Sequence, residues 1–262
     1  GKKEKPFHGD LVIENGKIAE VGTHVEIPAD FPKERVLNAA GGYITPGFLD
    51  IHRHGDWQAF GNGDDELLNR QGLTTVVNGN CGLSVAPGEK FGKEIARFLS
   101  SVTGDFRWGK DENTDDTEGV LFSKKKEESC GISEKEIEID ALRIMSTMSA
   151  YMSALGKEKC SVNTGMLAGN GTIRASVKGY ASGKLSKEEL HQVWKAVEEA
   201  LSAGALGISL GIAYAPEFEY DRDGLVEALQ PLKGTDIPIT THIRNEGDGI
   251  LLALQEVISV AE

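Results

Sequence analysis

The chain has 262 residues, of which 39% are hydrophobic and 26% are charged, and its formal net charge is −13. This balance is ordinary for a globular protein, but the acidic excess repels nucleic acids and anionic membranes, so we expect neither as a partner. No apolar run approaches the roughly 18 residues of a membrane span, and three cysteines at unrelated spacings predict a reducing compartment, the cytoplasm.

The N-terminal region predicts a small β domain, which we assign to residues 1–45. Asn15-Gly16 lies between two apolar-rich runs, 10–14 and 17–21, and this pattern is a strong β-hairpin signal. A third short strand is expected over 35–38. Residues 1–9 are expected to form a loop. These elements are too few for a barrel, so the second domain, residues 46–262, holds the rest of the fold.

From residue 48 onward, predicted strands alternate with predicted helices, which indicates βα units and a parallel sheet. Strands are expected over residues 48–52, 74–78, 160–167, 205–210 and 237–241. Helices are expected over residues 64–70, 89–102, 133–155, 186–201, 223–232 and 248–262. The helix at 186–201 is the clearest, because Ser186 and Glu189 form a capping box in front of an apolar stripe.

A polar stretch at about 103–133 interrupts this alternation. It is rich in aspartate and glutamate, then in lysine, and has few aromatic residues. Its composition predicts a solvated or partly disordered insertion in a loop. A lid over the active site is the alternative.

A buried apolar strand through Phe48, Leu49 and Ile51 is expected to end in two histidines, in the stretch YITPGFLDIHRHGD at 43–56. Alternate side chains of a strand share a face, so His52 and His54 should point the same way. Two imidazoles on one face can hold a metal ion. For the motif alone, a solvated strand end is the alternative.

This stretch resembles the first-strand signature of the amidohydrolase superfamily. NGNCGLSVAP at 78–87 is similar to the second-strand segment of one branch, the D-aminoacylases (N-acyl-D-amino-acid deacylases). GIAYAP at 211–216 and THIRNE at 241–246 resemble two further segments of that branch. The resemblance implies an α/β fold, a (β/α)₈ TIM-type barrel of the metal-dependent hydrolase kind, present here as roughly its first five βα units. It also makes the N-terminal β domain part of a β-sandwich.

A barrel of this type gathers its functional residues at the carboxyl ends of its strands. His52, His54, Cys81 and His242 fall at such positions. The resemblance implies that Cys81 and His242 belong to a tight zinc site, and that His52 and His54 belong to a second, weaker divalent site. Hydantoinases and dihydroorotases differ, because a carboxylated lysine after strand four bridges their metals, and the segment 205–214 has no lysine. A small buried hydrophobe is the alternative for Cys81.

Other residues near these segments have less specific assignments. The resemblance implies that Tyr214 holds the substrate carboxylate, and an interfacial tyrosine is the alternative. Arg244 could orient a ligand or form a surface ion pair. Asp56, two residues after the second histidine, could support a ligand. Cys130 and Cys160 are expected to be bystanders.

The segment GNGTIR at 169–174 also resembles a family segment that follows strand three. That segment usually has histidine where this chain has Asn170. The departure puts any functional role for Asn170 in doubt.

The implied reaction is zinc-dependent hydrolysis of the amide bond of N-acyl-D-amino acids to a carboxylate and a free D-amino acid. The family's catalytic aspartate falls beyond Glu262, so no catalytic residue is expected within this chain, which alone should be inactive. Its expected partners are the small-molecule N-acyl amino acid and the C-terminal half of the same protein. Two alternatives stay open: another amidohydrolase, acting on cyclic amides or dipeptides, or a non-catalytic metal-binding fragment.

Overall fold

The computed structural model describes residues 5–60, 65–88, 107–109, 120–122, 143–158 and 160–262. The fold is mixed α/β and forms two compact units, Gly1–Pro46 and Gly47–Glu262. None of the helices in these ranges combines the length and apolarity that a membrane crossing requires.

The N-terminal unit contains the predicted hairpin. Strands β1 (Asp10–Glu14) and β2 (Lys17–Gly22) pair antiparallel. The turn between them has positive φ angles of 50° at Asn15 and 72° at Gly16, the conformation that an Asn-Gly hairpin turn requires. Residues 5–9 are loop, as expected, and residues 1–4 lie outside the described ranges.

The third strand predicted for this unit, at 35–38, is wrong. A short 3₁₀ helix, η1 (Lys33–Arg35), follows Pro32 instead, and the chain after it adopts no regular structure. Leu37 is 92% exposed. A strand is stable only when a neighbour satisfies its backbone groups, and the described residues offer none to this segment.

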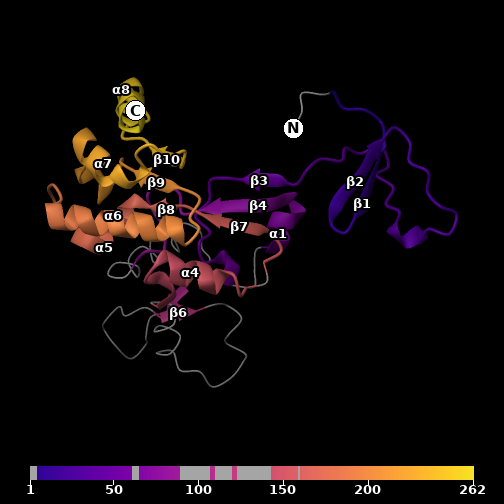
Figure 1. Cartoon of the computed structure of the whole chain (residues 1–262), viewed down its shortest axis with the longest axis horizontal. Coiled ribbons are helices and arrows are strands. Elements are labelled where there is room, and N and C mark those ends of the chain that lie inside the picture. The colour runs from indigo at the N-terminus through magenta and orange to yellow at the C-terminus, as the bar shows by residue number, and fades with distance from the viewer. Residues whose placement is uncertain (1–4, 61–64, 89–106, 110–119, 123–142, 159) are drawn as a thin grey trace, which may run out of the picture. The chain divides into compact units, whose positions relative to one another are not determined.

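The second unit is built on parallel strands that follow the chain order. One sheet has the order β3 (Phe48–Asp50), β4 (Leu73–Asn78), β7 (Asn163–Met166), and the other has β8 (Ala168–Gly169), β9 (Ile208–Gly211), β10 (Ile239–His242) (Figure 1). Every pairing in these two sheets is parallel. The chain passes from β7 to β8 at Leu167, so one strand run pairs first with β4 and then with β9. The predicted succession of parallel strands is therefore confirmed.

The strands of this series differ in burial. All four residues of β9 are buried, whereas Phe48 and Leu49 in β3 are 55% and 64% exposed. The strand predicted over 48–52 is therefore present but ends at Asp50, and the prediction that its apolar residues are buried is wrong. Within the described residues β3 pairs with β4 along one edge only, and no second layer covers its apolar side chains.

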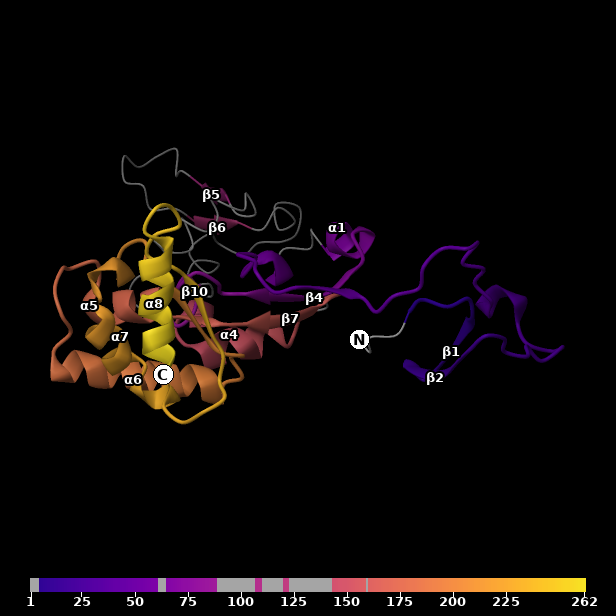
Figure 2. The ribbon, with the colours of Figure 1, turned by 90° about the horizontal axis from the view of Figure 1, so that it is seen from above.

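The helices of the second unit are α1 (Asp65–Arg70), α4 (Met148–Leu155), α5 (Asn170–Lys178), α6 (Lys187–Ser202), α7 (Arg222–Ala228) and α8 (Ile250–Ala261). Seen from above, α5, α6, α7 and α8 are grouped beside β10 (Figure 2). The shorter 3₁₀ helices are η2 (Gln58–Phe60), η4 (Glu217–Glu219) and η5 (Gln230–Leu232). Strands β5 (Arg107–Gly109) and β6 (Val120–Phe122) pair antiparallel within the polar insertion, whose other residues from 103 to 133 lie outside the described ranges.

Two helix predictions need correction, one helix was not predicted, and one predicted helix lies outside the described ranges. The helix expected over 133–155 is not continuous where it is described, because Thr147 is extended and its hydroxyl accepts from Ala150 to begin α4. The helix expected over 223–232 ends at Ala228, since Pro231 cannot continue it and η5 follows. Helix α5 was not predicted, because the segment from Asn170 lacks an apolar period. The helix predicted over 89–102 lies outside the described residues.

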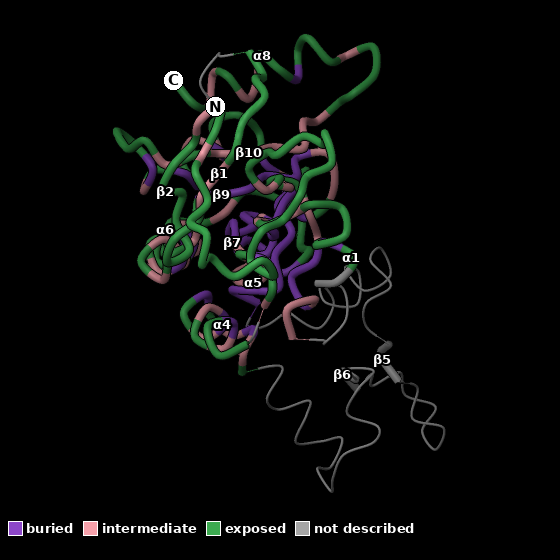
Figure 3. The backbone as a smooth tube through the Cα atoms, turned by 90° about the vertical axis from the view of Figure 1, so that its right-hand side faces the viewer, coloured by how far each residue is buried: buried purple, intermediate pink, exposed green. Residues whose placement is uncertain are grey.

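The core of this unit lies between the strands and α6. Figure 3 shows buried backbone gathered at the middle of the unit, around β7 and β9. Val193, Val197 and Ala200 on the apolar side of α6 are fully buried there. Burial of each large apolar side chain contributes about 1.5–3 kcal/mol. The strands are therefore held in place firmly enough to position the loops at their carboxyl ends.

Candidate metal centre

Three of the four predicted metal ligands form one group. The candidate ligand atoms of His52, His54 and Cys81 all lie within 4.8 Å of one another. His52 Nε2 is 3.1 Å from Cys81 Sγ, and the two imidazole rings meet edge to face with centroids 5.8 Å apart. Cys81 is buried, His54 is half-buried and His52 is exposed. The group therefore has a protected sulfur at one side and an accessible imidazole at the other.

This donor set fits a zinc ion. Tetrahedral zinc with Zn–N and Zn–S bonds near 2.0–2.3 Å places its ligand atoms about 3.3–3.8 Å apart, close to the spacing of this group. His54 Nδ1 is buried and has no hydrogen-bond partner among the described residues. Burial lowers the pKa of His54, and the charges of His52 and His242 lower it further. The lowered pKa favours the neutral imidazole, which is the form that binds metal. Burial also raises the pKa of the Cys81 thiol, and a bound cation would offset this by favouring the thiolate.

The two histidines lie just beyond β3 rather than within it. Past Asp50, the backbone N–H of His52 donates to Asp50 Oδ1 at 3.1 Å, and the N–H of Arg53 donates to the carbonyl of Val77 at 3.1 Å. The second bond keeps the segment beside the end of β4. The histidines therefore share the side that strand alternation predicts, although the strand itself is shorter.

Cys81 lies in a loop of residues 78–88, the cysteine loop, which is buried throughout. Its φ angle is +56°, in the left-handed region, between Gly79 at +75° and Gly82 at +71°. That conformation costs a residue with a Cβ roughly 1–2 kcal/mol. It persists only where surrounding contacts determine it, and such strain is concentrated at functional sites.

His242 and Tyr214 lie beside the group but outside it. His242 ends β10, and its ring centroid is 5.3 Å from that of Tyr214. Its Nε2 is 3.6 Å from Glu246 Oε1. The hydroxyl of Tyr214 donates a hydrogen bond to the carbonyl of Cys81. The structure thus brings all five predicted site residues into one neighbourhood, with His242 outside the group of three.

Glu217 is a feature of this neighbourhood that was not predicted. It is buried in η4, where its carboxylate accepts from the backbone N–H of Gly211 at 2.6 Å and from Asn170 Nδ2 at 2.8 Å. Burial raises its pKa to about 7. The carboxylate also packs against Gly82. The sequence places Glu217 directly after GIAYAP, but a glutamate there gives no signal that it will be buried.

Arg244 forms an ion pair and several hydrogen bonds within the fold. Its guanidinium pairs with Glu256 at 2.8 Å and donates to the carbonyls of Ile212, Phe218 and Tyr220. These contacts join α8 to the segment after β9. Of the two predicted roles, the ion pair is the one that the geometry supports.

Of the other two cysteines, only Cys160 lies in the described part of the chain. Cys160 is half-buried, packs against the core and is not part of the metal-type group. Cys130 lies outside the described residues.

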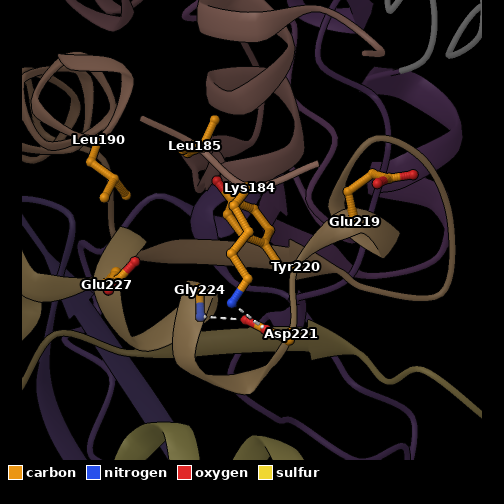
Figure 4. A pocket seen from close by; sticks show the side chains of 8 residues that line it. All are labelled: Lys184, Leu185, Leu190, Glu219, Tyr220, Asp221, Gly224 and Glu227. Atoms are coloured by element: carbon orange, nitrogen blue, oxygen red, sulfur yellow. Dashed lines mark hydrogen bonds and ion pairs between the residues drawn. The ribbon is translucent and has the colours of Figure 1, made fainter. Parts of the chain in front are cut away.

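A separate pocket lies at the N-terminal end of α7. Lys184 Nζ is 2.7 Å from Asp221 Oδ2 there, and Asp221 Oδ1 accepts from the N–H of Gly224 at 2.8 Å (Figure 4). None of the residues lining it belongs to the metal-type group. Lys184 and Asp221 are already paired with each other, and the lining contains no histidine or cysteine, so the pocket offers no chemistry comparable with that of the metal-type group.

Comparison with known proteins points to one group of enzymes. The chain is 29% identical over 255 residues to an N-acyl-D-aspartate deacylase of Alcaligenes xylosoxydans xylosoxydans, a match that covers 96% of this chain and 43% of that protein. It superposes on the crystal structure of a D-aminoacylase described as defining a novel subset of amidohydrolases, with TM-score 0.60, 28% identity, and coverage of 82% and 38%. Over most of its length the chain is similar in sequence and fold to D-aminoacylases. No protein-family model matches it.

A further solved homologue carries metal. It is an N-acyl-D-glutamate deacylase of Bordetella bronchiseptica complexed with zinc and a phosphonate mimic of the tetrahedral intermediate, and it superposes with TM-score 0.66 and 25% identity. That match covers 97% of this chain and 44% of the deacylase. The chain therefore spans less than half the length of the deacylases it matches, and it corresponds to their N-terminal region.

Proposed function

We propose that the protein carrying this chain is a zinc-dependent amidohydrolase that cleaves the amide bond of N-acyl-D-amino acids. The observation that carries the proposal is the group formed by His52, His54 and Cys81, whose ligand atoms lie within 4.8 Å of one another beside the ends of β3 and β4. A sulfur and two imidazoles from separate segments are a donor set suited to zinc. The homology to deacylases supplies the reaction class.

The proposed architecture is a (β/α)₈ barrel. Residues 46–262 would form its first five βα units, and the C-terminal part of the same protein would supply the others. Parallel pairing in chain order from β3 to β10 supports this assignment. Residues 1–45 would belong to a β-sandwich domain, an assignment for which the hairpin of β1 and β2 is the support.

The proposed ligands are His52, His54, Cys81 and His242, for one tight zinc ion and a second, weaker divalent ion. Bound zinc supplies a Lewis acid that lowers the pKa of water to about 7. The residues of this chain would hold the ligand atoms in place and control their access to solvent. The buried cysteine loop shields the sulfur from solvent, while the exposed His52 leaves one side of the group open to a small molecule.

Tyr214 is proposed to bind the substrate carboxylate. Its ring contacts that of His242, so its hydroxyl is near the group. A phenol has one proton to donate, and in this structure that proton goes to the carbonyl of Cys81. Binding a carboxylate would require that bond to be exchanged, and a substrate could thereby change the conformation of the cysteine loop.

Zinc content of a Cys81→Ala variant tests the ligand assignment. We expect the full-length variant to lose tightly bound zinc and hydrolysis of N-acetyl-D-amino acids together. Cys160→Ala is the matched control, because it removes a half-buried thiol outside the group and should keep both. If Cys81→Ala retains zinc by atomic absorption after gel filtration, the assignment is wrong.

The substrate class needs a separate measurement. Hydrolysis of N-acetyl-D-amino acids, N-acetyl-L-amino acids, hydantoins and dipeptides by the zinc-loaded protein distinguishes a deacylase from a cyclic-amide or dipeptide hydrolase. Hydrolysis of the D-series alone supports the proposal. Tight zinc binding with no hydrolysis of any substrate would instead support a non-catalytic metal-binding protein.

A further inference from the structure

A buried aspartate joins the two segments that carry the metal-type residues. Asp56 is 1% exposed and lies two residues after His54. Its Oδ1 accepts from the backbone N–H of Gly79 at 3.2 Å, and its Oδ2 accepts from the N–H of Val85 at 3.0 Å. These two donors lie on either side of Cys81. One carboxylate therefore connects the histidine segment to both arms of the cysteine loop.

Side chains of the cysteine loop also bond the backbone of the histidine segment. We call the place where these two segments meet the junction. Asn78 Oδ1 accepts from the N–H of Gly55 at 3.0 Å, so Asn78 and Asp56 each bond the backbone next to the other. Asn80 Nδ2 donates to the carbonyl of Ile51 at 3.3 Å. Regular pairing of β3 and β4 has ended here, and these bonds take its place. Besides the backbone bond from Arg53 to Val77, the two segments are therefore joined by side chains, and Asp56 is the one that bonds both arms of the cysteine loop.

Asp56 is suited to this task by chemistry as well as position. Hydrogen bonds from backbone N–H groups to a carboxylate are roughly twice as strong as neutral ones. Removing the carboxylate would leave two buried N–H groups without partners, at about 1–3 kcal/mol each. Both oxygens are occupied by these amides, and Asp56 is not part of the metal-type group, so it is not a ligand itself.

We propose that Asp56 is a positioning residue that fixes the Cys81 sulfur relative to the imidazoles of His52 and His54. The inference rests on the proposed function, which makes those residues metal ligands. Positioning of this kind is separable from general stability. Loss of Asp56 lets the cysteine loop move relative to the histidines, whereas loss of a distant core contact leaves their spacing unchanged in the folded state.

Zinc affinity of Asp56→Asn, measured by chelator competition on the full-length protein, tests the proposal. Asparagine keeps the shape but turns an NH₂ donor toward one of the two backbone donors. We expect zinc affinity to fall about 10–100-fold, the usual effect of losing a group that orients metal ligands. With cobalt substituted for zinc, the thiolate-to-cobalt absorption should weaken. Wild-type affinity and absorption in this variant would overturn the proposal.

Leu225→Ala is the matched control for stability. Leu225 is fully buried in α7 and contributes to the core away from the junction. Its truncation should lower the free energy of unfolding by about 2–5 kcal/mol, yet leave the cobalt spectrum and zinc affinity as in wild type. If Leu225→Ala weakens zinc binding as much as Asp56→Asn does, Asp56 has only a general structural role and the proposal fails.

Two more variants keep the test decisive. If Asp56→Asn does not fold, Asn78→Ala opens the same junction from the other segment, and unchanged zinc affinity there would contradict the proposal. In a Cys81→Ala background, Asp56→Asn should weaken metal binding little further, since the sulfur it positions is gone. Retention of zinc by Cys81→Ala alone would reject the ligand assignment, an outcome distinct from failure of the Asp56 proposal.

Discussion

The cysteine loop and helix α6 are both built into the second unit, but they are held in opposite ways. In α6 the stabilising bonds are local: Ser186 accepts from the N–H of Glu189, and Glu189 accepts from the N–H of Ser186. In the cysteine loop the partners are remote. Ser209 bonds Gly79 and Gly82 across 130 and 127 residues of sequence.

This difference separates two kinds of structural role. A helix whose bonds are local keeps its conformation when a distant contact is lost. A substitution in such a helix should therefore lower only the free energy of unfolding. A loop whose bonds are remote, and which holds a cysteine at φ +56°, keeps its conformation only while its neighbours stay in place. Damage to its contacts should therefore reach the metal-type residues as well as stability.

Gly82→Ala should have the largest effect. A Cβ at Gly82 would lie 1.8 Å from Glu217 Oε2 and 2.6 Å from the backbone nitrogen of Gly211, and the φ angle is +71°. Strain and overpacking together should lower the free energy of unfolding by about 2–5 kcal/mol, and the displaced loop should weaken zinc binding. Chemical denaturation and chelator competition measure the two effects.

Gly234→Ala provides the comparison for this variant. Gly234 has a φ angle of +75°, but a Cβ there meets nothing within 4 Å. Only backbone strain of about 1–2 kcal/mol is expected, with zinc binding as in wild type. Equal losses in the two variants would mean that the close contacts of Gly82 have no special importance, and the contrast between the regions would weaken.

Ser209→Ala should have the next largest effect. Its hydroxyl donates to the carbonyl of Gly79 at 2.5 Å and accepts from the N–H of Gly82 at 3.0 Å. Both groups are buried, so losing their partner should cost about 1–3 kcal/mol. Because Cys81 lies between them, zinc affinity should also decrease. A stable variant with unchanged affinity would show that the loop holds its conformation without this hydroxyl.

The elements that were predicted correctly are those whose conformation depends on neighbouring residues in the sequence. The hairpin at Asn15-Gly16, the capping box of α6 and the order of the parallel strands were all predicted from short-range signals. Helix α5 was missed because its burial comes from tertiary packing rather than from an apolar stripe. Strand order also indicated that His52, His54 and Cys81 would lie together, and the structure brings their ligand atoms within 4.8 Å, while their role as ligands stays a prediction.

The supports of the site were predicted less completely: Asp56 was singled out as a possible support for a ligand, but its partners were not identified, and Glu217 was not predicted. Asp56 and Glu217 are carboxylates, which composition assigns to the surface, yet both are 1% exposed. Apart from the Asn170 side chain that donates to Glu217, their partners are backbone N–H groups, which no residue pattern distinguishes. Which amides a carboxylate reaches is decided by the folded chain, so sequence spacing alone cannot identify it.

Ser186→Ala should have a smaller effect, confined to stability. Its hydroxyl accepts from the N–H of Glu189 at 3.2 Å at the first turn of α6. Loss of such a cap costs about 0.5–2 kcal/mol. The free energy of unfolding should fall by that amount, with zinc affinity as in wild type. A change in the cobalt spectrum would show that α6 is coupled to the metal-type residues after all.

Glu189→Gln should have the smallest effect, visible in its dependence on pH. The bond from the N–H of Ser186, then the ammonium of Lys178 at 3.1 Å, lowers the pKa of Glu189 below its ordinary value of 4.5. A carboxyl with a lowered pKa stabilises the folded state fully above the unfolded value, and this contribution is lost as pH falls below 4.5 through the folded pKa. Glutamine keeps the hydrogen bond from Ser186 but lacks the negative charge at the helix N-terminus. That charge stabilises the folded state by about 0.3–1 kcal/mol.

The difference in unfolding free energy between Glu189→Gln and wild type should therefore be present at pH 7 and vanish near pH 3, as urea titrations at both pH values would measure. Zinc affinity at pH 7 should be the same in both proteins. A difference that persisted at low pH would assign the cap to hydrogen bonding alone. A change in zinc affinity would contradict the contrast between the two regions, because it would show that a substitution in α6 also alters the cysteine loop.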